Sequence, residues 1–458
     1  MEYLVILVVI VVIAVIAYRS VQSSKQSKTK SPSSGQSQSQ SQIKSRTLMD
    51  VLSEDGDTSV RQAVSWNRAA SAELLSKLAR DPEDAVRIGV AGNENTSVET
   101  LELLSKDASV SVRRDVATNE NTPQRILVTL IEDDTPYSTE STAPFAATNP
   151  NTPPDALRNY VNRVLAQESE KDYIGLWSEV SNPSMPQDIL ETLLQVCLTS
   201  DEYAATSLKH GIARNPGASL KILDALARDE SSYVRYGLEQ NPQAPQNALR
   251  TCYELYGANS DLAENPNIPQ DILEECARDE DSSTRSAVAR NKSASNDVLN
   301  MLANDSSESV RATVAENPNT PQEALERLSF DESEYVRKSV AKNPSITHAI
   351  ATELFADTEE VREGLALNPS SPKEVLDRLA KEEDEYIRIY VASNENTAPE
   401  TLEEMVSSPT APLYTRIVIA IGENPNTPPR LLSFLSGNTD KFLREAVARN
   451  PKIAEIQA

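Results

Sequence analysis

An asparagine that recurs at a nearly fixed interval constrains this chain more than any other feature. It stands at fifteen positions, and in ten of them proline follows. Most intervals are 24–26 residues, and four are 30 or 33. The positions are Asn67, Asn93, Asn119, Asn149, Asn182, Asn215, Asn241, Asn265, Asn291, Asn317, Asn343, Asn368, Asn394, Asn424 and Asn450. Such a period predicts an array of stacked supersecondary units rather than several globular domains.

Each unit has the same order of residues once it is aligned on this asparagine. Leucine stands eight residues after it in thirteen of the fourteen complete units, as at Leu325. The third residue before it is apolar in fourteen of fifteen, as at Val314. We expect the asparagine to end a first helix in the left-handed conformation, with proline preventing continuation. In residues 320–323 (Thr-Pro-Gln-Glu) we expect a capping box that starts a second helix. Because neither helix is stable alone, neighbouring units must stack.

A charged pattern accompanies the first helix. Arginine lies six residues before the asparagine in ten units, and in seven of these an aspartate lies six residues before the arginine. Such pairs can bridge adjacent layers through charge-assisted hydrogen bonds. A row of arginines alone would suit phosphate binding, but the matching acids argue against it. We interpret the pattern as a structural ladder, represented by Asp279, Arg285, Asp305, Arg311, Asp331 and Arg337.

The unit Val-Arg-x-x-Val-Ala-x-Asn-Pro-Asn-Thr-Pro-x-x-Leu-x-x-Leu-x-x-Asp resembles the leucine-rich repeat variant family, and its Asp…Val-Arg spacing resembles HEAT repeats. The resemblance covers residues 51–458 and is weakest between 133 and 214. It implies an all-α, right-handed α-solenoid of about fifteen two-helix repeats without strands, the second helix partly 3₁₀. At 8–10 Å per step, we expect an open, elongated superhelix with a path of roughly 110–140 Å. The founding member carries a cysteine-ligated iron–sulfur module, but Cys197, Cys252 and Cys276 are too dispersed for one here.

The first 46 residues differ from the repeats. Residues 3–18 are uncharged, and as a helix they span about 24 Å. Flanking tyrosines and a snorkelling Arg19 extend that towards the hydrocarbon thickness, so we expect a transmembrane anchor at 1–18. A cleaved signal peptide is the rival, since Val15 and Ala17 suit a cleavage site, although no basic residue precedes the segment. Residues 19–46 are rich in Ser, Gln and Lys and predict a disordered linker before a repeat domain at 47–458.

Charge indicates the topology and limits the partners. Basic residues follow the apolar segment and none precedes it. The positive-inside rule therefore predicts a single-pass bacterial cell-membrane protein with its N-terminus outside and its repeats in the cytoplasm. An extracytoplasmic repeat domain is the alternative. Of 44 basic and 69 acidic residues, the first 46 positions hold six and one, which leaves 38 and 68 for the repeats. Such an acidic body disfavours nucleic acid as a partner.

The chain shows no motif of catalysis or metal binding. Its two histidines, His210 and His348, stand in no HExxH context, and no P-loop or GxSxG occurs. We therefore expect no catalytic, cofactor or metal site, and we interpret the cysteines as buried core residues. The predicted function is a non-enzymatic scaffold that binds another protein. The alternatives are an extracytoplasmic recognition protein and, less favoured, a HEAT-like nucleic-acid repair enzyme.

Two features suggest where a partner binds. The aromatic residues Tyr233, Tyr335, Tyr386 and Phe442 each precede the apolar-Arg pair of a first helix. If this position faces outward they are candidate anchors, and if it faces a neighbouring unit they are packing residues. Turns such as 331–334 and 381–385 also carry more acids than helix capping needs. A continuous negative edge would attract a basic partner, or it would serve only solubility.

Overall fold

The computed structural model describes residues 46–132, 141–166, 176, 178–198, 202–407 and 414–457. Every regular element among them is a helix, which confirms the all-α class for this part of the chain. The expected anchor (1–18) and all but the last residue of the expected linker (19–46) lie outside the described residues. Within the described ranges, no helix combines the length and the apolar character needed to cross a membrane.

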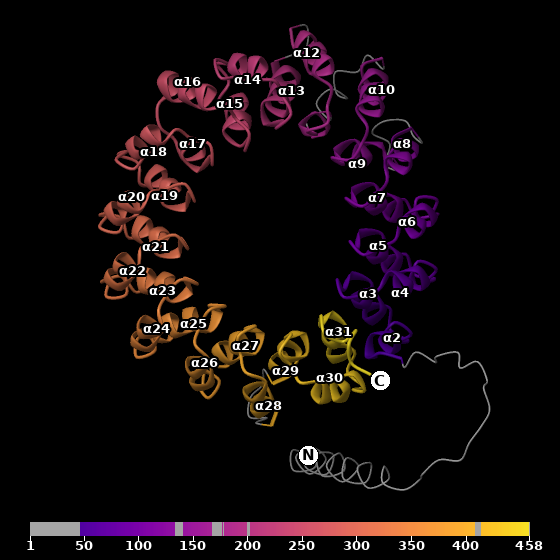
Figure 1. Ribbon diagram of the computed structural model, residues 1–458, viewed down its shortest axis with the longest axis vertical. Coiled ribbons are helices and arrows are strands. Elements are labelled where there is room, and N and C mark those ends of the chain that lie inside the picture. The colour runs from indigo at the N-terminus through magenta and orange to yellow at the C-terminus, as the bar shows by residue number, and fades with distance from the viewer. Residues whose placement is uncertain are drawn as a thin grey trace, which may run out of the picture. The chain divides into compact units, whose positions relative to one another are not determined.

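Helices alternate between an inner and an outer layer (Figure 1). The inner layer consists of the first helices of the units. These are α3 (Thr58–Trp66), α5 (Asp84–Gly92), α7 (Val110–Thr118), α9 (Ala143–Thr148), η1 (Glu179–Ser181), α13 (Glu202–Arg214), α15 (Ser232–Glu239), α17 (Ser260–Glu264), α19 (Ser282–Arg290), α21 (Glu308–Glu316), α23 (Glu334–Lys342), α25 (Glu359–Leu367), α27 (Glu385–Ser393), α29 (Tyr414–Glu423) and α31 (Lys441–Arg449).

The outer layer consists of the second helices, together with α2 (Leu48–Leu52). The second helices are α4 (Ala72–Leu78), α6 (Val98–Leu104), α8 (Gln124–Glu132), α10 (Pro154–Leu165), α12 (Gln187–Val196), α14 (Leu220–Leu226), α16 (Gln246–Tyr256), α18 (Gln270–Cys276), α20 (Asn296–Leu302), α22 (Gln322–Leu328), α24 (His348–Leu354), α26 (Lys373–Leu379), α28 (Pro399–Ser407) and α30 (Pro429–Ser436). All are α-helices, so the expected 3₁₀ character is wrong, and the described 3₁₀ helix, η1, is a first helix.

The core lies between the two layers. Leu325 on α22 and Val314 on α21 are fully buried, and the corresponding residues of the other units line up in the same cluster. Ala351, which replaces the leucine in one unit, is equally buried. The apolar stripe expected from the sequence is therefore the interface between inner and outer helices.

The repeated asparagine joins units through its side chain. Asn343 is buried, and its Nδ2 donates to Ala315 O at 2.5 Å and to Asn317 O at 2.9 Å, both in the preceding unit. Its Oδ1 accepts from the N–H of Ser345 at 2.7 Å. Its backbone is extended (φ −69°, ψ 124°). The expected left-handed conformation is therefore wrong, because this residue is selected for its amide and not for a tolerated positive φ.

The start of the second helix also differs from expectation. Pro321 is the N-cap of α22 and makes no side-chain cap, while the Thr320 hydroxyl donates backwards to Val314 O at 2.5 Å. The capping box expected at 320–323 is wrong, because proline has taken the cap position. At Ser295, the N-cap of α20, the serine hydroxyl does cap the helix by accepting from the N–H of Val298.

The ends of the repeat body meet and close it into a ring (Figure 1). Arg444 Nε lies 2.8 Å from Asp55 Oδ2, and Asn67 Nδ2 donates to Ala448 O and Asn450 O at 2.9 Å each. These are the bonds that join consecutive units elsewhere in the array. The expected open and elongated superhelix is therefore wrong, because the first unit continues the register of the last.

The fifteenth unit is assembled from both ends of the chain. Its first helix is α31, and the place of its second helix is filled by α2, which contacts α30 and α31. Thr47 and Gln457 form an antiparallel bridge, and the N–H of Leu48 donates to Ile456 O at 2.7 Å. Three apolar side chains of α2, Leu48, Met49 and Leu52, are buried, whereas Val51 is 41% exposed.

We expect Asn343→Ala to lower the free energy of unfolding by about 1–3 kcal/mol, because it leaves buried carbonyl groups without a donor. Asn319→Ala is the control, since this exposed asparagine makes a single side-chain bond to Lys292 O at 3.2 Å. Thermal unfolding followed by circular dichroism measures both. Equal melting temperatures for the two variants would contradict the assigned role of the buried amide.

Candidate partner-binding surface

Where a first helix carries the ladder arginine, as at Arg285, this side chain connects two turns. Arg285 Nη1 donates to Asp279 O at 2.7 Å, six residues earlier. Its Nε and Nη2 donate to the Asp305 carboxylate in the next unit at 2.7 and 2.9 Å. The structure thus places Asp305 against the arginine of the preceding unit, while the Asp305 carbonyl accepts from Arg311 of its own unit at 2.9 Å. Arg311 with Asp331 and Arg337 with Asp357 repeat this geometry.

Several units replace a member of this ladder. Lys209 takes the arginine position and lies 2.8 Å from Asp229. Arg235 stacks over Tyr256, with Cζ 3.6 Å from the ring centroid. Asp279 faces no arginine, because Asn259 stands in the preceding unit; its carboxylate instead accepts from the N–H of Asp281 at 2.8 Å. The contact between adjacent units at the ladder position therefore varies with the residue type. It is an Asp–Arg pair in some units, and an Asp–Lys pair or an Arg–Tyr stack in others.

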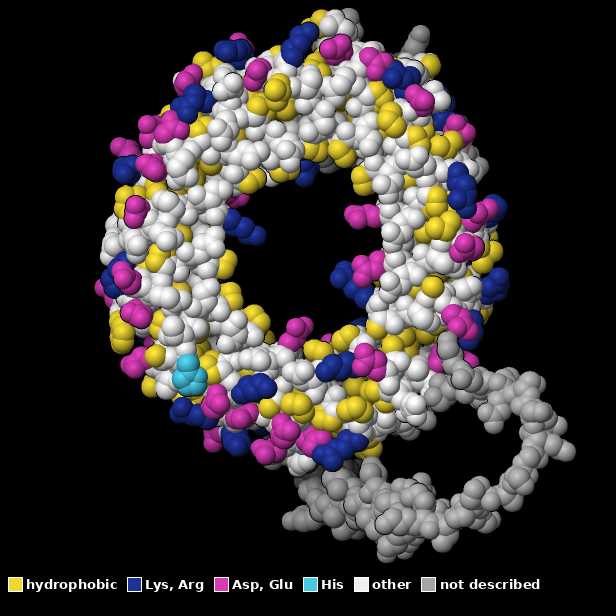
Figure 2. Space-filling model, viewed as in Figure 1, with side chains coloured by type: hydrophobic (Ala, Val, Ile, Leu, Met, Phe, Trp, Pro, Cys, Tyr) yellow, Lys and Arg dark blue, Asp and Glu magenta, His cyan; other side chains and the backbone are white. Residues whose placement is uncertain are grey.

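The two ends of the first helices form two different edges of the ring. A nine-residue helix is about 13 Å long, so the asparagine turns and the Asp–Arg turns are separated by that distance. We call the edge with the Asp–Arg turns the acidic edge; it includes residues 81–84, 279–282, 331–334 and 382–385. Figure 2 shows one face of the ring, on which charged side chains gather mainly towards the outside.

The four candidate aromatic residues lie in the first turn of their helices, at the acidic edge. Tyr233, Tyr335, Tyr386 and Phe442 are 45–56% exposed. About half of each of these residues is exposed and about half is packed against the protein, so both alternatives describe part of their surface. Tyr233 stacks on His210 with ring centroids 4.0 Å apart, and Arg416 lies 6.0 Å from the ring centroid of Tyr386.

Some carboxylates of the acidic edge form ion pairs or cap helices, and others are largely exposed to solvent. Asp331 pairs with Arg311 at 2.7 Å, whereas the neighbouring Glu332 lies 3.9 Å from the same guanidinium and has a side chain that is 92% exposed. In the turn before α27, Asp384 caps the helix by accepting from the N–H of Ile387. The carboxylate of Asp384 raises the pKa of Glu359 in the adjacent unit. Like charges are thus crowded between α25 and α27, beyond what the fold requires.

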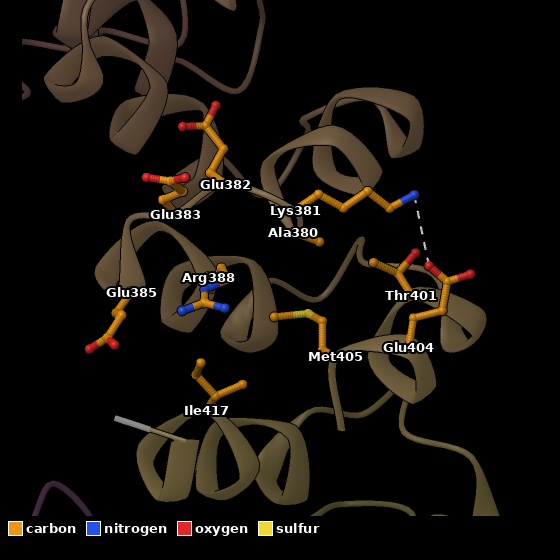
Figure 3. Close-up of a pocket in the computed structure, with 10 residues that line it drawn as sticks. All are labelled: Ala380, Lys381, Glu382, Glu383, Glu385, Arg388, Thr401, Glu404, Met405 and Ile417. Atoms are coloured by element: carbon orange, nitrogen blue, oxygen red, sulfur yellow. Dashed lines mark ion pairs between the residues drawn. The ribbon is translucent and has the colours of Figure 1, made fainter. Parts of the chain in front are cut away.

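A cavity of about 560 Å³ lies beside this crowded region, between α27, α28 and α29 (Figure 3). Arg388 points into it between the acidic turn 382–385 and the apolar side chains of Met405 and Ile417. Its Nε is buried and makes no hydrogen bond to the described residues. The next-unit position that pairs with this arginine elsewhere is 408, which lies outside them. The cavity combines a guanidinium with several carboxylates, an arrangement suited to binding rather than to nucleophilic chemistry.

Other residues singled out in the sequence lie elsewhere. Burial raises the thiol pKa of Cys252 to about 12 and of Cys197 and Cys276 to about 11, which leaves them unreactive at neutral pH. His210 is buried, and His348 begins α24 in the outer layer. Within the described part of the chain, no group of His, Cys, Asp or Glu is arranged to hold a metal ion.

One buried acid was missed by the sequence reasoning. Glu179 is 1% exposed and accepts hydrogen bonds from Tyr160 at 3.2 Å and from Ser178 at 2.5 Å. Burial raises its pKa. It occupies the third position before Asn182, which is apolar in every other unit. That single exception was the available signal.

The same geometry recurs in a known family. A family model described as leucine rich repeat variant matches residues 309–333, which span α21, the asparagine turn and α22. The unit at residues 309–333 is therefore similar to the leucine-rich repeat variant. The resemblance expected from the motif is thereby confirmed, and helical solenoids of this kind commonly present extended binding surfaces.

Comparison with solved structures gives weaker similarities. One is described as a leucine-rich repeat variant with a novel repetitive protein structural motif (24% identity, 48% of this chain and 87% of that chain, TM-score 0.32). A second is an engineered protein, with 16% identity over 90% of this chain and 98% of that chain and a TM-score of 0.22. A third is the Pds5–Scc1 complex, with 12% identity over 89% of this chain and 71% of that chain and a TM-score of 0.18. These TM-scores support no functional transfer. No curated protein matches the chain.

We expect the repeat body to lose folding stability at acidic pH. Burial opposes ionisation of Asp331, but hydrogen bonds from Arg311 and the N–H of Ser333 outweigh it, so the pKa of Asp331 lies below its ordinary value of 3.8. A lowered folded-state pKa contributes stability above the unfolded pKa and loses it as pH falls through the folded pKa. Melting temperature should therefore change little above about pH 5 and fall below about pH 4.

Asp331→Asn tests the residue behind this acid loss. At neutral pH it should cost about 1.5–3 kcal/mol, because Arg311 loses a charged acceptor, and its further loss in acid should be smaller than that of the natural sequence. Glu280→Gln, on the same edge but outside the ladder, is the control. An unchanged acid profile for Asp331→Asn would show that the ladder does not govern it.

Proposed function

We propose that this protein is a membrane-anchored, non-enzymatic scaffold that recruits a protein with a basic surface or tail to its acidic edge. The observation that carries the proposal is the pair of exposed tyrosines, Tyr335 and Tyr386, on an edge that also carries the exposed carboxylates of Glu332 and Glu383. A tyrosine face and a nearby carboxylate together suit the cationic side chains of lysine and arginine.

The spacing of these residues favours an elongated partner segment. Tyr335, Tyr386 and Phe442 lie on α23, α27 and α31, which are successively two units apart. Two steps of 8–10 Å separate neighbouring aromatic residues by roughly 16–20 Å. Glu360 and Arg416 hold the same position in the units between them. A partner that contacts several of these side chains must therefore extend along the edge.

Membrane anchoring is the second part of the proposal, and it rests on the uncharged segment 3–18 and the basic residues that follow it. With the N-terminus outside, the ring would present its acidic edge in the cytoplasm. A ring held outside the membrane, where it would act as a recognition protein, is the alternative.

Binding of a short Lys/Arg-rich peptide to the full chain tests the acidic edge. We expect affinity to fall as salt rises, because exposed charge pairs are screened beyond a Debye length of about 10 Å at 0.1 M. Tyr335→Ala with Tyr386→Ala should weaken binding about tenfold, and Phe434→Ala on the outer helix α30 is the control. Affinity that is insensitive to salt, or to the paired tyrosine change, would contradict the proposal.

Reporter fusions after residue 46 test the topology. We expect a reporter that is active only in the cytoplasm to be active, and one that requires export to be inactive. Moving the basic residues to precede the apolar segment should reverse the result, since the Lys/Arg bias sets orientation. The opposite pattern in the natural chain would place the ring outside.

A further inference from the structure

The ring has one boundary that the backbone does not cross. We call it the seam: α2 and α3 on one side, α30 and α31 on the other. At every other boundary the chain runs from a second helix into the next first helix, so separated units stay linked. Across the seam, the paired residues Asp55 and Arg444 are 389 positions apart in the sequence. Only here can the ring part and leave a gap.

The seam is also held by the shortest outer helix. α2 has five residues, whereas each of the other described outer helices has seven or more. α2 is held by three buried apolar side chains, the Thr47–Gln457 bridge and the backbone hydrogen bonds from Leu48 to Ile456 and from Met49 to Ile453. Local opening favours elements with few buried contacts and no covalent restraint.

We propose that the ring opens and closes at the seam, with α2 acting as a latch. The bonds across the seam have the geometry of those within the array: Arg444 Nε and Nη2 donate to Asp55 at 2.8 and 3.2 Å, compared with 2.7 and 2.9 Å for Arg285 and Asp305. The closed state is therefore a regular continuation of the repeats. Opening costs one interface and exposes the open centre of the ring, visible in Figure 2, to a partner that has no free end.

The position of the latch in the chain gives it a means of control. Thr47, the N-cap of α2, directly follows the segment proposed to tether the ring. Arg46 lies 2.6 Å from Glu54, and both side chains are more than half exposed, so this pair adds little. A pull or a binding event on the preceding segment would therefore act first on α2. This consequence rests on the proposed anchor, whereas seam opening does not.

Spin labels on Thr47→Cys and Gln457→Cys in the full chain report the state of the seam. The natural cysteines are buried with raised thiol pKa values, so labelling is directed to the new sites. Residues opposite each other in an antiparallel pair have Cα atoms about 4.5–5.5 Å apart, so the closed ring should show strong dipolar broadening. On warming, the broadening should disappear before the helical circular dichroism falls. Loss of both at the same temperature would overturn the latch.

Charge reversal gives a matched comparison. Asp55→Lys should abolish the broadening while helical content is kept. Asp305→Lys removes the equivalent pair inside the array, and it should retain the broadening. Asp55→Arg combined with Arg444→Asp should restore at least half of it. Broadening retained in Asp55→Lys, or lost equally in Asp305→Lys, would show that the seam is not the place of opening. Neither result would bear on binding of basic peptides at the acidic edge.

Discussion

The structure depends on a buried side-chain amide that has to satisfy backbone carbonyl groups. A helix leaves its last carbonyls without intrahelical donors, and burial makes them costly. Each repeated asparagine donates its side-chain amide to carbonyl groups of the unit before it. Asn119, for example, donates to Ala91 O at 2.7 Å and to Asn93 O at 3.0 Å. Because the donor and its acceptors belong to different units, the amide fixes how far one unit is displaced from the next. The layers therefore stack in a single register.

This constraint explains which irregularities the array tolerates. Asn149 donates to Ala117 O and Asn119 O at 2.8 and 3.0 Å although its unit is longer than most. The additional residues fall between the second helix and the next first helix, away from the amide. Loss of an acid from the Asp–Arg ladder is also tolerated, as at Arg235 over Tyr256. The asparagine is kept throughout, whereas the charged bridge varies.

Helix pairing, the core leucines and the ladder residues could be predicted, because each depends on spacing within one or two units. The backbone conformation of the asparagine and the cap of the second helix could not. The same residue types allow two hydrogen-bond arrangements, and only packing selects between them. Closure of the ring could not be predicted either, because it depends on a small rotation between neighbouring units that adds up over the whole array.

Closure also changes how the proposed scaffold presents its surface. In a ring the acidic edge has no ends, and Tyr335, Tyr386 and Phe442 follow one another along it at intervals of two units. Electron microscopy of the full chain tests the central claim, that the amide register brings the first and last units together. The account predicts closed rings with an open centre. Crescents or rods with separated ends, in most particles, would contradict it.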